Sequence, residues 1–191
     1  MSLIEWSGAP DEGRERLAAI ADELAPSVSS LGVVPFLEIQ TLTDEIFAAG
    51  KRTYIKAGFA HALTPALIEA VCGQGAQVGS EFSQIEALSM GGAISRVPVE
   101  ATAFPHRDAA WLLNIPATWL HCDDDAREIA WVRESYGVIS PHLAPGKYVN
   151  FMDGDEEAGG GAFGDTLARL RVVKRRYDPE NVFALNQNIA P

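Results

Sequence analysis

The stretch RRYDPENVFALNQNIAP occupies residues 175–191 and carries the densest pattern in the chain. Its Asp178-Pro179 step predicts the end of a helix, because a residue before proline disfavours the helical conformation. The apolar anchors around this step are Tyr177, Phe183, Leu185 and Ile189. Three amide side chains follow in Asn186, Gln187 and Asn188. Each amide offers donors and an acceptor, so the three suit the polar edge of a ring, or else they hold the backbone of a docked C-terminal turn.

A second informative stretch is GKYVNFMD, residues 146–153. Its alternation predicts a strand over residues 147–152, with Tyr148 and Asn150 on one face and Lys147 on the other. A Tyr and an Asn on one face could both contact a bound ring or sugar, whereas the plainer interpretation is a half-buried Tyr anchored by its hydroxyl. A free tyrosine has a pKa near 10, so a catalytic one requires a nearby cation or strong hydrogen bonds.

Hydrophobic periodicity and turn residues predict a mixture of helices and strands along the whole chain. The expected helices cover residues 17–24, 64–73, 123–136 and 166–176, and the last should bury Leu167, Leu170 and Val173. The expected strands cover residues 33–42, 53–60, 81–88, 93–97, 110–120 and 147–152. Several neighbouring strands lack a helical crossover, which favours an antiparallel α+β fold over a doubly wound parallel sheet.

Both stretches resemble motifs of the berberine bridge enzyme-like FAD-linked oxidases. The ending is similar to that family's YDPxxxFxxxQxI signature, and residues 146–153 are similar to its G-x-Y-x-N-[YF]-x-D segment. The GGAISRV and TAFPHR motifs at residues 91–97 and 102–107, and the YIKAGF motif at residues 54–59, also resemble family sequences. The resemblance implies an antiparallel sheet with helices on one face and its open face against a flavin. It divides the chain into a substrate-binding part, 1–145, and a C-terminal berberine-like segment, 146–191, that completes the same domain.

The resemblance also implies roles for particular residues. Tyr148 would take a proton from a substrate hydroxyl while hydride passes to the flavin, and Asn150, Asn186, Gln187 and Asn188 would contact the cofactor. His106 and Arg107 follow Phe104-Pro105 and could line a substrate pocket or a surface turn. Glu38 and Gln40 alternate with apolar residues on an expected strand and could face a sugar-like substrate. No metal site is expected.

Composition limits the classes of partner. The chain has 191 residues, 47% hydrophobic and 21% charged, with a net charge of −11. This acidity argues against nucleic acid and anionic membranes, which attract clustered Lys and Arg. Two cysteines, Cys72 and Cys122, predict small buried thiols in a reduced compartment. No apolar run of about 18 residues and no leader pattern is visible, so we expect a cytoplasmic protein.

No glycine-rich phosphate-binding loop of the family's FAD domain is recognisable in the chain. The first hypothesis is therefore the substrate side of an FAD-dependent oxidoreductase that oxidises an alcohol, sugar or similar molecule with dioxygen as acceptor. Its FAD domain would be supplied in cis or in trans, and we expect this chain alone to be inactive. The alternatives are a non-catalytic small-molecule-binding or interaction subunit that pairs with a separate FAD-domain protein, and a flavin-free binding domain. A homo-oligomer stays open.

Overall fold

The computed structural model describes residues 3–156 and 159–191. The chain divides into two compact units, Met1–Glu45 and Ile46–Pro191. The division expected at 145/146 concerns family segments within the larger unit and stays a prediction. No helix in the described part of the chain is long and apolar enough to cross a membrane.

The smaller unit contains helices α1 (Pro10–Leu24) and α2 (Phe36–Gln40). Helix α1 begins with proline, whose fixed φ suits the first turn, and ends at Ala25 in the left-handed conformation with φ 43°. The expected strand over residues 33–42 is wrong, because the chain there forms α2 directly after Pro35. Alternation over so short an apolar run does not distinguish a strand from a helical turn.

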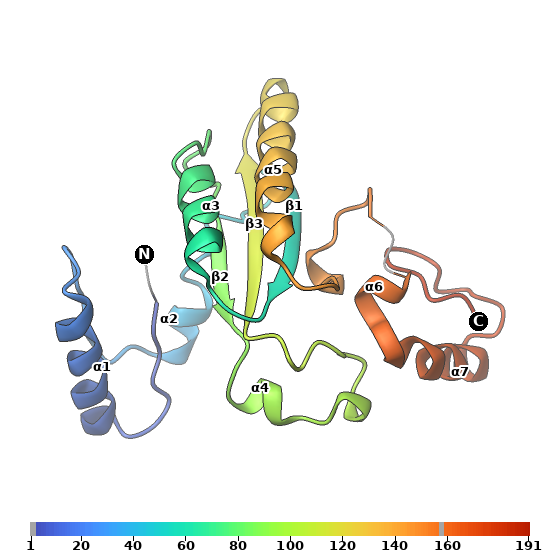
Figure 1. Ribbon diagram of the computed structural model, residues 1–191, viewed down its shortest axis with the longest axis horizontal. Helices are drawn as coiled ribbons and strands as arrows, with labels where there is room; N and C mark the ends of the chain where they lie inside the picture. Colours follow the sequence, from blue (N-terminus) through green and yellow to red (C-terminus); the bar gives the residue numbers. More distant parts are fainter. Residues whose placement is uncertain (1–2, 157–158) are drawn as a thin grey trace. The chain divides into compact units, whose positions relative to one another are not determined.

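The larger unit is built on a three-stranded antiparallel sheet with strand order β1-β3-β2 (Figure 1). Strand β1 (Arg52–Ala60) pairs along its whole length with β3 (Trp111–Trp119), and β2 (Glu86–Ser89) pairs with β3 on the other side. The expected strands at residues 53–60 and 110–120 are therefore confirmed. The expected strand at 81–88 is confirmed at its C-terminal end alone, where β2 starts at Glu86.

Helices α3 (Pro65–Gly75) and α5 (Asp125–Ile139) cover one face of this sheet (Figure 1). The Thr64 hydroxyl caps α3 by accepting a hydrogen bond from the Leu67 amide at 3.2 Å. The core between helices and sheet contains fully buried Leu113, Val132 and Ile139. The expected fold class, an antiparallel α+β fold with helices on one face, is confirmed.

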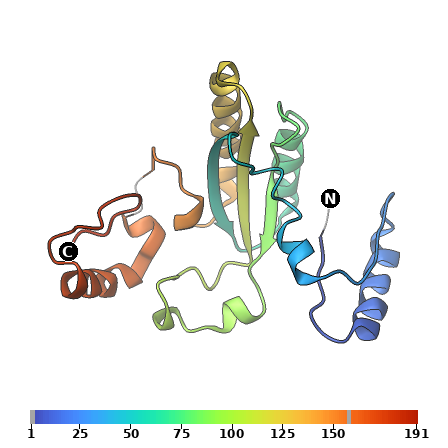
Figure 2. The same ribbon diagram turned by 180° about the vertical axis from the view of Figure 1, so that it is seen from behind.

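Side chains alternate along the strands, so those that do not face α3 and α5 lie on the opposite face of the sheet. In Figure 2 this face of the sheet is turned toward the viewer, and the two helices lie behind it. We call this the distal face; it carries Ala57, Phe59, Leu112 and Asn114. Phe59 and Leu112 pack there against aromatic residues from the loops that follow β2 and α5. The distal face is therefore where distant chain segments meet the sheet.

The rest of the larger unit consists of short helices and 3-10 turns. Helices α4 (Ala93–Arg96), α6 (Gly159–Phe163) and α7 (Leu167–Tyr177) lie outside the sheet layer (Figure 1). The 3-10 turns are Val99–Ala101, Cys122–Asp124, Ser140–His142, Val149–Phe151 and Gly164–Thr166. Helix α7 confirms the helix expected at 166–176, and Leu167 and Leu170 pack against Phe163 as predicted. Val173, expected inside, is instead 45% exposed.

Three other sequence predictions are wrong. Residues 93–97 form α4 rather than a strand, because Gly92 turns the chain at φ 65° directly before it. Residues 147–152 contain the 3-10 turn Val149–Phe151 rather than a strand, and this turn comes shortly after Gly146 at φ 117°. Cys72 and Cys122 are exposed rather than buried. At residues 93–97 and 147–152 the glycine turn before the segment decided the conformation and the periodicity did not.

Candidate functional site

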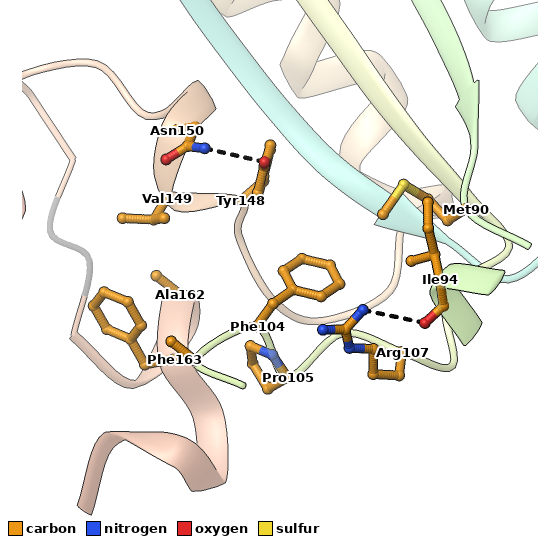
Figure 3. A pocket seen from close by; sticks show the side chains of 11 residues that line it. Met90, Ile94, Phe104, Pro105, Arg107, Tyr148, Val149, Asn150, Ala162 and Phe163 are labelled. Carbon is orange, nitrogen blue, oxygen red and sulfur yellow. Dashed lines mark hydrogen bonds between the residues drawn. The ribbon is translucent and has the colours of Figure 1, made fainter. Parts of the chain in front are cut away.

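A pocket of about 380 Å³ lies within the larger unit, between the loops that meet the distal face (Figure 3). Its walls are mostly apolar and aromatic, with a guanidinium, a phenol and an amide among them. The lining residues are Met90, Ile94, Ala103, Phe104, Pro105, Arg107, Tyr148, Val149, Asn150, Ala162 and Phe163. A concave apolar site with a few polar groups is the usual form of a small-molecule site.

Tyr148 and Asn150 both line this pocket and are hydrogen-bonded to each other (Figure 3). The Asn150 Nδ2 donates to the Tyr148 hydroxyl oxygen at 3.0 Å. The Tyr148 ring is held edge-on by Phe104 and Phe151, at centroid distances of 5.8 Å and 5.1 Å. The predicted strand is absent, yet a single 3-10 turn still brings the two polar groups together. Lys147, predicted to face away from Tyr148, pairs with Glu156 at 2.6 Å.

Arg107 forms the cationic part of the pocket wall. Its two terminal nitrogens donate to the Ile94 carbonyl at 3.1 Å and to the Thr102 hydroxyl at 2.6 Å. Its guanidinium carbon lies 4.8 Å from the centre of the Phe104 ring, within the range of a cation–π interaction. The buried Nε has no acceptor among the described residues. Arg107 therefore fixes the loop that carries Phe104 and leaves one donor for another group.

His106 occupies a packed position beside the pocket. Its ring lies 4.4 Å from the Phe59 ring, and its Nε2 is 3.2 Å from the Ala162 carbonyl oxygen. A Cβ on Gly146 would come within 2.4 Å of the imidazole, so glycine is required for this close approach. These contacts hold the start of the 148–151 turn and α6 near the sheet. The substrate-binding role expected for His106 stays a prediction.

The other predicted site residues lie elsewhere. Glu38 and Gln40 are exposed on α2 of the smaller unit, where positions two apart do not share a helix face, so the expected alternation on a strand is wrong. Asn186 and Asn188 are exposed, and Gln187 is half-buried, in the irregular segment after α7. Asn186 has a φ of 59°, a conformation that Asn tolerates better than most residues. The cofactor roles of the three amides stay predictions.

The structure adds a polar pair that the sequence reasoning missed, a buried Asn114 and a half-buried Glu86. Asn114, 3% exposed on the distal face, donates from Nδ2 to the Glu86 Oε2 at 2.8 Å. Its carbonyl oxygen has no partner among the described residues, although buried polar atoms are normally paired. Asn114 lies two positions from Leu112, which packs in the cluster that includes Tyr148. A lone Asn within the apolar run WLLNIPATW was the available sequence signal.

A network of ion pairs ties the segment after the pocket to β1. The Lys56 amino group lies 2.8 Å from Asp155 and 3.1 Å from Glu156, and Glu156 also pairs with Lys147. The Tyr54 hydroxyl donates to Asp155 at 2.7 Å, and Arg133 reaches the same carboxylate at 3.1 Å. The network joins β1, α5 and residues 153–156. It therefore fixes the segment directly C-terminal to Tyr148 and Asn150.

The network shifts the ionisation of its members. Hydrogen bonds from Lys56 and Tyr54 hold the pKa of Asp155 well below its usual range, against the opposing effect of burial, and Arg133 adds to the shift. Burial alone would lower the pKa of Lys56, but hydrogen bonds to Asp155, Glu156 and Tyr54 outweigh it and raise that pKa. The folded chain therefore favours the charged form of both groups.

We expect the larger unit to lose stability as the pH falls below about 4, the unfolded pKa of an aspartate. In this range the unfolded state takes up a proton at Asp155 that the folded state takes up at lower pH, so acid favours unfolding. Urea midpoints measured from pH 6 to pH 2.5 should fall, and Asp155→Asn should flatten part of that fall. Glu134→Gln, on the exposed surface of α5, is the control. If the urea midpoint of Asp155→Asn falls with pH as steeply as that of the unchanged chain, Asp155 does not cause the acid destabilisation.

Comparisons with known proteins agree with these features. Residues 147–190 match the family described as berberine and berberine like. The chain is 39% identical over 105 residues to an uncharacterized FAD-linked oxidoreductase, YvdP, of Bacillus subtilis, covering 54% of this chain and 23% of YvdP. An FAD-linked oxidoreductase of Dictyostelium discoideum is 27% identical over 190 residues, covering 97% of this chain and 41% of the relative.

A solved structure has the same fold over most of the chain. The glycopeptide hexose oxidase DBV29, complexed with teicoplanin, superposes with a TM-score of 0.66 and 28% identity, covering 74% of this chain and 33% of that one. The chain thus spans less than half the length of these relatives. The matched segment 147–190 starts one residue before Tyr148 and includes Asn150 and the ending that the sequence singled out. Residues 147–190 thus match the berberine and berberine-like family, and the chain is similar to part of the berberine bridge enzyme-like FAD-linked oxidoreductases.

Proposed function

We propose that the chain forms the substrate side of an FAD-dependent oxidoreductase that oxidises an alcohol, a sugar or a similar small molecule. The observation that carries this proposal is the hydrogen-bonded pair of Tyr148 and Asn150 at the wall of an apolar pocket. The family match covers both residues. A hexose oxidase among the structural relatives supports a hydroxyl-bearing substrate.

In this proposal Tyr148, as its phenolate, accepts the proton of a substrate hydroxyl as the carbon that bears this hydroxyl loses hydride. Asn150 donates to the phenolic oxygen and so stabilises the negative charge that proton transfer requires there. The edge-on contacts with Phe104 and Phe151 fix the ring, so that its oxygen is aimed before the substrate arrives. Arg107 and the aromatic wall position the substrate and exclude water.

The distal face fits the polar edge of a cofactor such as FAD. The unpaired Asn114 carbonyl oxygen is a buried acceptor that requires a donor, and the neighbouring Glu86 carboxylate fixes its orientation. FAD, when bound, would accept the hydride, which carries both electrons of the oxidation. Asn114 would hold the edge of a ring at this face, and dioxygen would reoxidise the cofactor.

A second candidate is an interaction subunit that has no catalytic role and pairs with a separate FAD-domain protein. Large exposed apolar side chains at the C-terminal end, such as Phe183 at 81% and Leu185 at 88% exposure, support it. The two candidates differ in whether Tyr148 affects turnover in the assembled protein.

The absorption spectrum of bound flavin distinguishes the two candidate functions from a binding domain that uses no flavin. The full-length gene product and this 191-residue chain would be purified side by side and scanned from 350 to 500 nm. Yellow full-length protein and a colourless chain support the proposal. A gene product of these residues alone that stays colourless with added FAD, and also with the host's FAD-domain proteins, would refute it.

A further inference from the structure

Arg107 is a cation in the pocket wall for which the chain supplies no anion. Arg52, Arg127 and Arg133 each pair with a carboxylate of the chain. Arg107 makes no ion pair among the described residues, although the chain carries 26 acidic residues against 15 basic ones. Its contacts are two uncharged oxygens and the ring of Phe104. The chain therefore leaves this positive charge uncompensated.

The rest of the pocket wall offers no compensating charge either. Among the described residues no carboxylate lines the pocket, and its other polar side chains are the Tyr148 phenol and the Asn150 amide. The remaining lining side chains are apolar or aromatic, so they limit the water that solvates the guanidinium. A charge that is removed from water without a partner costs free energy, and its attraction for an anion grows as the dielectric constant falls. The pocket therefore favours an occupant with a negative charge.

The guanidinium keeps N–H groups for such an occupant. An arginine has five N–H donors, and the Ile94 carbonyl and the Thr102 hydroxyl take one from each terminal nitrogen. Each terminal nitrogen therefore retains a second N–H group. These two bonds and the contact with the Phe104 ring hold the guanidinium in one position at the pocket wall (Figure 3). A guanidinium fixed before binding matches the two oxygens of a carboxylate.

We infer that the pocket selects substrates that carry a carboxylate in addition to the hydroxyl that is oxidised, with Arg107 as the residue that binds the carboxylate; this inference rests on the proposed function. Arg107 and Tyr148 both contact the Phe104 ring, at 4.8 Å and 5.8 Å from its centre. One small molecule can therefore place its carboxylate at Arg107 and its hydroxyl at Tyr148.

The size and the lining of the pocket narrow the class further. A volume of about 380 Å³ is near the lower end of the range for small-molecule sites, so it suits a substrate with a single ring. The apolar and aromatic side chains of the wall would contact the faces of that ring. The substrate class is thus a hydroxy acid in which one aromatic or sugar ring separates the carboxylate from the hydroxyl.

Paired probes that differ in charge alone test the inference. The compounds para-hydroxymethylbenzoate and para-hydroxymethylbenzamide have the same ring and the same alcohol, and the benzoate is ionised at about pH 7. D-glucuronate and D-glucuronamide form a second pair with a sugar ring. Binding of all four to the full-length gene product would be measured by isothermal titration calorimetry. In at least one pair the acid should bind about tenfold more tightly than the amide, because its hydrogen bonds to Arg107 are charge-assisted.

Three further variants separate the charge of Arg107 from its contacts with the loop. Arg107→Gln should remove the preference for the acid, whereas Arg107→Lys should retain part of it, because the charge is kept. Thr102→Val removes an acceptor of Arg107 and changes no charge, so it should weaken the acid and the amide by the same factor. Arg96→Gln is the matched control, because Arg96 is exposed on α4 and does not line the pocket. This control should keep the full preference.

Several results would overturn the inference. They are equal binding of acid and amide in both pairs, a preference for the amides, binding of none of the four probes, and a preference for the acid that survives in Arg107→Gln. Amide binding that persists in Arg107→Gln shows that this variant is folded.

The flavin content of the same preparation distinguishes failure of the inference from failure of the proposed function. Yellow protein without a preference for the acids refutes the carboxylate and leaves the proposed function standing. Protein that never binds flavin but prefers the acids retains the anion-binding site, and the proposed function then fails.

Discussion

Replacing Tyr148 with phenylalanine should lower the rate of flavin reduction by substrate about 10²- to 10⁴-fold in the assembled flavoenzyme. The substitution keeps the ring that packs edge-on against Phe104 and Phe151 and removes the hydroxyl alone. Substrate would still enter the pocket, so the loss should appear in kcat far more than in KM. Stopped-flow measurement of flavin bleaching under anaerobic conditions isolates this step from reoxidation.

Asn150 tests whether the two side chains act together. Asn150→Ala should slow flavin reduction about tenfold, the effect of losing one hydrogen bond to the charged phenolic oxygen. In the Tyr148→Phe background the same change should have little further effect, because the Asn150 donor then has no phenolic oxygen to stabilise. If the free-energy losses of the two single variants add up in the double variant, Asn150 acts on the cofactor or the substrate directly and not through Tyr148.

Tyr136→Phe is the matched control for the hydroxyl deletion. Tyr136 lies on α5 and packs against the core on the other face of the sheet. Its substitution should leave flavin reduction within about twofold of the starting rate. A Tyr148→Phe enzyme as fast as this control would show that the phenol is structural, and the interaction-subunit reading would then be preferred.

Lys56→Met should destabilise the larger unit by about 3 kcal/mol, the usual cost of removing one member of a buried ion pair. The Lys56 side chain is 11% exposed and Glu156 is 7% exposed, so water cannot readily replace the lost cation. The Asp155 carboxylate is 40% exposed, so water can solvate it and the loss of its ion pair with Lys56 costs less stability. Urea unfolding followed by tryptophan fluorescence measures the effect, since Trp111, Trp119 and Trp131 all belong to this unit.

Arg52→Met provides the comparison on the same strand. Arg52 pairs with Asp125 at 2.5 Å, but its side chain is 47% exposed, and exposed ion pairs contribute little to stability. Adding Glu156→Gln to Lys56→Met should recover part of the lost stability, because the buried Glu156 carboxylate, left with Lys147 as its ion-pair partner, is then replaced by a neutral amide. Equal effects of Lys56→Met and Arg52→Met would contradict the role assigned to the buried network.

The elements that were predicted correctly have local causes. Strand β3 is a mostly apolar run that stays buried, and β1 is largely buried after its first two residues. Helix α3 begins at a Thr-Pro cap, and α7 ends just before Asp178-Pro179. Where a glycine or proline changed the direction of the chain, as at Gly92 and Gly146, the same periodicity predicted strands that do not form. A short alternating run buries few apolar side chains, so their preference for a strand is weaker than the change of chain direction at a neighbouring turn.

By itself, the sequence indicated the resemblance to the family, the antiparallel α+β fold, and Tyr148 and Asn150 as neighbours, because these depend on motifs and on residues close together in the chain. Tertiary structure alone decided which distant groups meet. Asn114 reaches Glu86 across 28 positions through the β2–β3 pairing, and Lys56 reaches Asp155 across 99. Such contacts depend on strand register and loop docking, which are set by packing of the whole unit and by no single stretch of residues.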